Sequence, residues 1–163
     1  MLGIDPGLAT TGWGVVEESG GHLRALASGV IRTSAEQSTP ARLQAIHCEI
    51  KRLAEEWKPT EAAVEEVFFS RNVRTAMSVG QARGVAILAL ADAGLEMVEY
   101  TPLAIKQAVT GYGSADKRQM QEMVKMLLGL SEIPRPDDAA DALAVAICHL
   151  HSARLRKLSE QGQ

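Results

Sequence analysis

The sequence predicts an α/β domain in which helices cover both faces of a mixed central sheet. Three short apolar segments with strand-like alternation open the chain, and from about residue 38 the apolar spacing changes to that of a helix. Beyond residue 60, strand-like and helix-like segments alternate, which favours parallel pairing with helices on both faces. With 163 residues, of which 46% are hydrophobic, the chain can bury one core but is too short for two domains of common size.

Turn residues and apolar spacing place the elements along the chain. A Pro-Gly pair and a Ser-Gly-Gly-His turn separate three expected strands, at residues 2–5, 11–18 and 23–33. A helix follows, with Ser38 or Thr39 as N-cap, Pro59 as the stop, and an apolar stripe formed by Leu43, Ile46, Ile50, Leu53 and Trp57. The remaining elements are a strand at 61–69, a long helix ending near Gly94, a strand at 96–100, and helices at 102–109, 116–128 and 137–157. We expect one domain over residues 1–157 and a flexible tail at 158–163.

Composition argues against several classes of protein. No apolar segment approaches the roughly 20 residues of a membrane span, and the N-terminus lacks the basic start of a secretory signal, so a cytoplasmic protein with no membrane partner is expected. The two cysteines are 100 positions apart and suggest neither a disulfide framework nor a zinc site. The net charge is −3, yet residues 68–128 carry 7 Lys and Arg against 5 Asp and Glu. The middle of the chain is therefore its basic part.

Acidic residues occur at the ends of two predicted strands. Asp5 ends an apolar strand just before a turn, a position that often presents a ligand, although the residue could simply cap the turn. Glu65 and Glu66 are adjacent in another apolar strand, so alternation sends them to opposite faces. A lone buried carboxylate is costly unless it is paired or bound to a metal. Periodicity does not say which of the two is buried, and an exposed pair at a strand end is the alternative.

A third acidic group, formed by Asp137, Asp138 and Asp141, lies at the start of the last helix. Acidic residues stabilise a helix N-terminus, which accounts for one of the three. Asp141 lies a turn inside, on the same face as Asp138, where like charges repel. A charged first turn and a cation site are both compatible with this segment. If the three groups converge, their carboxylates would suit two hard ions such as Mg²⁺ or Mn²⁺, which could activate water against a phosphodiester.

Five segments resemble the RuvC family of bacterial Holliday-junction resolvases: LGIDPG, AVEEVFFSRN, GQARGVAI, IKQAVTGYGSADK and PDDAADALAVAICHLH. The resemblance runs from Leu2 to about residue 152. It implies the ribonuclease-H-like fold, a homodimer, and cleavage of four-way DNA junctions with two Mg²⁺ or Mn²⁺ ions per subunit. The family's four catalytic and metal-binding acids fall on Asp5, Glu65, Asp138 and Asp141. This choice sets aside Glu66 and Asp137.

The same resemblance implies DNA contacts. Lys106 and Lys117 match lysines that approach the DNA near the cut, and Phe68 matches an aromatic residue that stacks on an unpaired base. Phe69 is the alternative stacking residue, because neighbouring strand residues face opposite sides and only one exposed ring is needed. Further phosphate contacts are expected from Arg71, Arg74, Arg83 and Arg118.

A two-fold dimer would present two identical sites to a junction that is itself nearly two-fold symmetric, so paired nicks follow from symmetry. Gly80 and Gly84, on the long helix after the second acid, would allow another backbone to approach, within the subunit or across the two-fold axis. The resemblance favours the dimer face. It also implies 5′-phosphate and 3′-hydroxyl ends, and cooperation in DNA recombination and repair with the branch-migration motor formed by RuvA- and RuvB-type proteins.

Three other functions fit parts of the sequence. The segment DPGLATTG could be the phosphate loop of an actin-like ATPase or sugar kinase, but that class needs two duplicated domains and 163 residues leave room for one. A junction-binding module without catalysis would not need acids at all four positions. A general RNA nuclease of the same fold is the closest competitor, and the segments around Phe68, Lys106 and Lys117 distinguish it.

Overall fold

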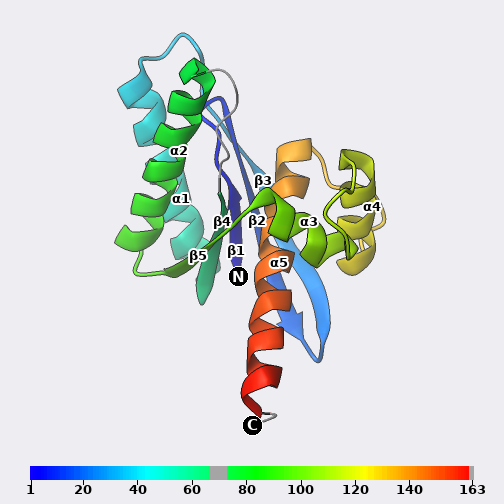
Figure 1. The fold of residues 1–163 in the computed structure, drawn as a ribbon. Helices are drawn as coiled ribbons and strands as arrows, with labels where there is room; N and C mark the ends of the chain where they lie inside the picture. Colours follow the sequence, from blue (N-terminus) through cyan, green and yellow to red (C-terminus); the bar gives the residue numbers. More distant parts are fainter. Residues whose placement is uncertain (67–72, 162–163) are drawn as a thin grey trace.

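One five-stranded sheet forms the centre of the protein, as the computed structural model shows for residues 1–66 and 73–161, without the side chains of 73–75 and 154–161 (Figure 1). The elements follow the chain in this order: β1 (Leu2–Asp5), β2 (Thr10–Ser19), β3 (His22–Arg32), α1 (Thr39–Trp57), β4 (Glu61–Glu65), α2 (Val73–Asp92), β5 (Glu96–Tyr100), α3 (Pro102–Thr110), α4 (Lys117–Leu127) and α5 (Asp137–Gln161). The strand order is β3-β2-β1-β4-β5. The first three strands pair antiparallel, whereas β1–β4 and β4–β5 are parallel. The prediction of a mixed sheet is confirmed.

Helices cover both faces of this sheet, as predicted (Figure 1). On one face α1 and α2 share a core with β1, β2 and β4, and the buried residues include Leu2, Ile4, Ile46, Ile50, Leu53 and Leu90. On the other face α5 lies between the sheet and the pair α3 and α4, in a second core that includes Val16, Ile105, Val124, Leu143 and Ile147. Because sheet and helices enclose it, α5 is buried continuously from Ala142 to His149.

The element boundaries agree with the sequence prediction except at two places. The strand predicted at 61–69 ends at Glu65, because its ladder with β5 stops at the pair Glu65 and Tyr100, and Thr101 then caps α3. Residues 67–69 lie outside the described residues. The last helix continues past the predicted residue 157 to Gln161. No helix in the ranges 1–66 and 73–161 is both long and apolar enough to cross a membrane.

Two helix caps position the lysines that the sequence singled out. The hydroxyl of Thr101 accepts a hydrogen bond from the backbone nitrogen of Ala104 at 3.1 Å, at the start of the helix that carries Lys106. Asp116 and Gln119 form a reciprocal capping box at the start of α4, with both side-chain-to-backbone bonds at 2.9 Å. This box fixes the place where the chain turns into the helix at Lys117.

Replacing Asp116 with Ala should lower the free energy of unfolding by about 1 kcal/mol, because the backbone nitrogen of Gln119 loses its partner. Urea unfolding followed by circular dichroism measures the change. Asp116→Asn is the matched control, since Asn is an equally good N-cap, and it should retain most of the stability. Equal losses in the two variants would contradict a role for the cap.

Candidate active site

Two of the predicted acids lie side by side at one edge of the sheet. Asp5 ends β1 and Glu65 ends β4, and the parallel pairing of these strands brings both carboxyl ends to the same edge. The two side chains share a hydrogen bond. The turn after Asp5 is held by the buried Thr11, whose hydroxyl donates to the backbone oxygen of Gly7 at 2.8 Å. The position of Asp5 therefore rests on the sheet and on a fixed turn.

The start of α5 brings the other two acids to the same place. Asp138 and Asp141 lie in the first two turns of this helix, where it meets β1 and β2. Both are close enough to Asp5 for their negative charges to raise its pKa. The structure thus brings together the four acids that the family resemblance selected, from two strands and one helix.

Burial and mutual repulsion raise the pKa values of three of these acids, Asp5, Glu65 and Asp141. Burial, followed by the charges of Glu65 and Asp141, raises the pKa of Asp5 to about 8. Burial also raises the pKa of Glu65, against the opposing effect of its hydrogen bond to Asp5. At Asp141 burial again raises the pKa, although the nearby Lys117 opposes it. A bound cation would relieve the repulsion and favour the ionised carboxylates.

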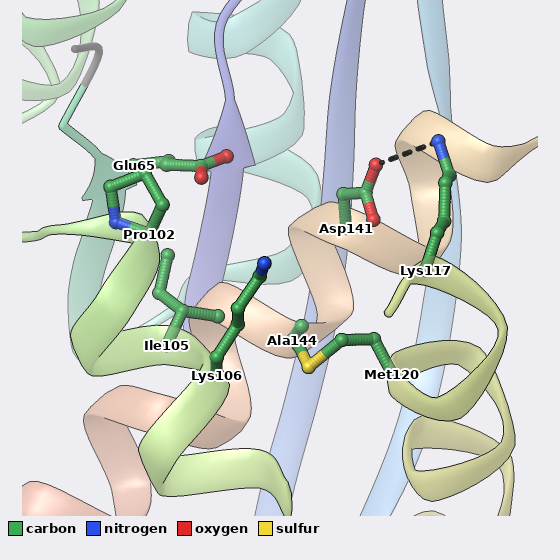
Figure 2. Close-up of a pocket in the computed structure, with 8 residues that line it drawn as sticks. All are labelled: Glu65, Pro102, Ile105, Lys106, Lys117, Met120, Asp141 and Ala144. Carbon is green, nitrogen blue, oxygen red and sulfur yellow. Dashed lines mark ion pairs between the residues drawn. The ribbon is translucent and has the colours of Figure 1, made fainter. Parts of the chain in front are cut away.

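A cleft of about 220 Å³ opens beside these acids (Figure 2). Glu65 and Asp141 lie on opposite sides of it, and the side chain of Lys106 points between them from α3 (Figure 2). The remaining lining residues are Pro102, Ile105, Lys117, Met120 and Ala144. Asp5, Asp138 and Glu66, the alternative to Glu65, are not among its lining residues. Two acids and two lysines thus face the same cleft, an arrangement that suits a phosphate group held near cations.

Lys117 forms ion pairs with two acids of α5. Its ammonium nitrogen lies 3.4 Å from a carboxylate oxygen of Asp141 and 3.3 Å from one of Asp137 (Figure 2 shows the pair with Asp141). Asp137, the first residue of α5, also pairs with Arg135 at 2.7 Å. Asp137 therefore lies at the outside of the site, where it pairs with Lys117 and Arg135.

The donor set suits a hard divalent ion, since the four acids offer oxygen ligands alone. In the described ranges, however, no three acidic, His or Cys side chains are already arranged around a common point. One reason is visible in the geometry, because the carboxylate of Asp141 is turned toward Lys117. Metal binding at these residues would therefore require Asp141 to exchange Lys117 for the ion.

The other predicted DNA contacts are spread over several parts of the chain. Phe68, Phe69 and Arg71 lie outside the described residues, as does the side chain of Arg74. Arg118 is exposed on α4, next to Lys117. Arg83 lies elsewhere, in an ion pair with Glu99 between α2 and β5.

A hydrogen-bond network around one buried histidine was missed in the sequence. His149 of α5 is 2% exposed, and its ring nitrogens lie 2.8 Å from a carboxylate oxygen of Glu61 and 3.2 Å from the hydroxyl of Tyr100. Tyr100 ends β5, directly beside Glu65 in the parallel ladder. The network ties α5 to β4, which carries Glu65, and to the neighbouring strand β5. Its only signal in the sequence is a histidine inside an apolar helix.

The fold and the site together define a class of protein. A mixed sheet with two acids at parallel strand ends, and two more at the start of the helix across it, is the arrangement of a ribonuclease-H-like nuclease. Comparison with known proteins gives the family. The profile described as "Crossover junction endodeoxyribonuclease RuvC" matches residues 1–149, and the chain belongs to this family.

Individual relatives cover nearly the whole chain. Proteins named crossover junction endodeoxyribonuclease RuvC are 60% identical over 152 residues in Chloroflexus aurantiacus, covering 93% of both chains, and 57% identical over 162 residues in a Roseiflexus species, covering 99% of this chain and 96% of the relative. The solved structure of T. thermophilus RuvC in complex with a Holliday junction substrate is 39% identical, with a TM-score of 0.90 and 94% coverage of both chains.

Asp5→Asn should stabilise the metal-free protein near pH 8. Asp5 keeps its proton up to about pH 8 in the folded state but loses it near pH 3.8 when unfolded, so the free energy of unfolding falls as pH rises between these values. Asn cannot ionise and avoids this loss. Thermal melts in chelator should show a midpoint higher by roughly 2–4 °C or more at pH 8, with the difference shrinking toward pH 4.

Glu66→Gln is the matched control, because the Glu66 charge is not among those that raise the pKa of Asp5. It should leave the pH dependence of the melting midpoint unchanged. If the melting midpoint of Asp5→Asn at pH 8 is lower than that of the unmodified protein, the carboxylate of Asp5 does not destabilise the metal-free protein.

Proposed function

We propose that this chain is a structure-selective endonuclease that resolves Holliday junctions by metal-dependent hydrolysis of phosphodiesters. It would make two symmetric nicks in strands of like polarity, leaving 5′-phosphate and 3′-hydroxyl ends. The observation that carries the proposal is the convergence of Asp5, Glu65, Asp138 and Asp141 beside a cleft with two lysines at its rim. Membership of the RuvC family, and the solved relative bound to a junction, support the choice of substrate.

The four acids would hold two Mg²⁺ or Mn²⁺ ions in each subunit. When bound, such ions activate water for in-line attack on phosphorus and stabilise the leaving 3′ oxygen. The raised pKa values of Asp5, Glu65 and Asp141 support this assignment, because buried acids that repel one another gain most from a cation. In this role the sheet edge and the start of α5 fix the relative positions of the ligands.

The lysines would hold the scissile strand against this edge. Lys106 extends into the cleft from α3, where its ammonium group can bind a phosphate oxygen (Figure 2). Lys117 would bind a second phosphate once Asp141 turns to the metal. Arg118, exposed beside it, would extend the cationic track, whereas Phe68 or Phe69 would stack on an unpaired base at the junction centre.

A homodimer would supply the second nick. One face of α2 is exposed and apolar or small over several turns, with Met77 62% and Leu88 54% exposed. Gly80 and Gly84 lie on the same face, and neither has another group within 4 Å of a Cβ built on it. Because the space beside these glycines is empty within the subunit, they support a dimer interface on α2 rather than packing inside the subunit. The dimer would cooperate with a branch-migration motor of RuvA- and RuvB-type proteins. Its location would be the cytoplasm.

Asp138→Asn should abolish cleavage and leave junction binding intact. The substitution removes a metal ligand, and metal ions contribute several kcal/mol to stabilising the transition state, so the cleavage rate should fall by roughly 100-fold or more. Labelled four-way junction, linear duplex and single strands are compared in Mg²⁺, Mn²⁺ and chelator. The unmodified protein should nick only the junction, and only with metal.

Asp137→Asn is the matched control for this experiment, because the neighbouring acid faces Arg135 and Lys117 rather than Asp5. It should keep most of the activity. Equal cutting of all DNAs by the unmodified protein would indicate a metal nuclease without junction specificity. Tight junction binding with no cutting in either metal would indicate a binding module instead.

Leu88→Glu should convert the dimer to a monomer. A charge placed in the centre of an apolar two-fold interface appears twice and meets its own copy, so the dimer dissociation constant should rise by about 100-fold or more. Analytical ultracentrifugation measures the change. Met126→Glu is the control, since Met126 is 65% exposed on α4, away from α2, and its substitution should leave the dimer intact. A dimer that persists in Leu88→Glu places the interface elsewhere.

A further inference from the structure

Glycines on β1 and β2 mark the places where α5 approaches the sheet most closely. A Cβ atom built on Gly12 would lie 1.9 Å from the backbone oxygen of Asp138, and one on Gly3 would lie 2.2 Å from that of Ala142. Real Cβ atoms do not come within 3.0 Å of such groups. Backbone therefore rests on backbone where the first two turns of α5 meet the sheet.

The close approach is the reason for glycine at position 12. Gly12 lies inside a strand, where glycine is unfavourable, and its backbone does not adopt the positive φ that would require glycine. At Gly14, two residues on, the contact is milder, because a Cβ there would meet the side chain of Leu143 at 2.7 Å and the helix backbone only at 3.1 Å. A shift of a few tenths of an ångström relieves the backbone contact at Gly14, whereas at Gly12 the helix backbone itself has to move.

Gly12 also lies beside the first acid of the site. It is the direct partner of Asp5 in the antiparallel ladder between β1 and β2. Directly opposed residues in such a ladder project to the same face, with Cβ positions about 5 Å apart. A side chain at position 12 would thus stand between the carboxylate of Asp5 and the helical turn that carries Asp138.

We propose that Gly12 is a positioning residue of the metal site, which sets the separation of Asp5 and Asp138 by having no side chain. This inference rests on the proposed function only in taking these two acids as metal ligands. Enlarging residue 12 would lift the start of α5 and part the two acids, while the lysines that bind DNA stay on α3 and α4.

The test is Mn²⁺ binding to the free protein without DNA, followed by electron paramagnetic resonance, for Gly12→Ala and Gly14→Ala. Both are measured well below their melting midpoints. Gly12→Ala should weaken Mn²⁺ binding by about 10-fold or more, as expected when a supporting group of a metal site is altered. Gly14→Ala perturbs the same helix less, and its Mn²⁺ affinity should stay within about threefold of that of the unmodified protein. Junction affinity in chelator should change less than twofold in either variant.

Unchanged Mn²⁺ affinity in Gly12→Ala would overturn the proposal, and so would an equal loss in Gly14→Ala, since that would reflect general loosening of the helix. If Gly12→Ala does not fold, Gly3→Ala decides by the same criteria, because its Cβ would press on the residue after Asp141. An unmodified protein that binds Mn²⁺ but cuts no junction would refute the proposed function. The difference in Mn²⁺ affinity between the variants would still support the role of Gly12.

Discussion

The repulsion among carboxylates that share one buried edge of the sheet is the constraint on which the rest of the site depends. Burial is the largest cause of the raised pKa values of Asp5, Glu65 and Asp141, and this repulsion adds to it. The repulsion would also drive the helix away from the sheet if packing did not oppose it. The two lysines at the cleft are explained in the same terms, because Lys106 lowers the pKa of Glu65 and Lys117 lowers that of Asp141, each against the effect of burial. A site of this kind is unfavourable for folding and favourable for binding cations.

The packing of α5 supplies the opposing force. Its residues from Ala142 to His149 are buried between the sheet and the helices α3 and α4, with Leu143 and Ile147 fully enclosed. Alanines on the helix and glycines on the strands let the two backbones approach, which places the acids at a separation that longer side chains would not allow. At the far end of this buried stretch, His149 ties the helix to Glu61 and Tyr100. The apolar part of α5 therefore holds its charged start in place.

The sequence predicted the elements well because each has one clear period or turn signal. Strand alternation, the helical stripe of α1 and the Pro-Gly turn depend on neighbouring residues alone. The end of β4 was predicted too late, since it depends on where its partner β5 stops. The choice of Glu65 over Glu66 came from family resemblance, because alternation cannot tell which face lies toward a cleft built from other elements. The pairing of Lys117 with Asp141, and the contact of Gly12 with Asp138, join residues more than 20 positions apart and leave no local pattern.

The start of one apolar helix can hold three aspartates because the three side chains lie in different surroundings. Asp137 is partly exposed, pairs with Arg135 and Lys117, and complements the positive end of the helix dipole. Asp138 and Asp141 lie further in and contribute to the field at Asp5. Lys117 lies between the two groups, in contact with Asp137 outside and Asp141 inside. One lysine thus separates the inner acids from the outer one. If a cation replaces Lys117 at Asp141, the ammonium group of Lys117 can stay at the entrance of the site, paired with Asp137.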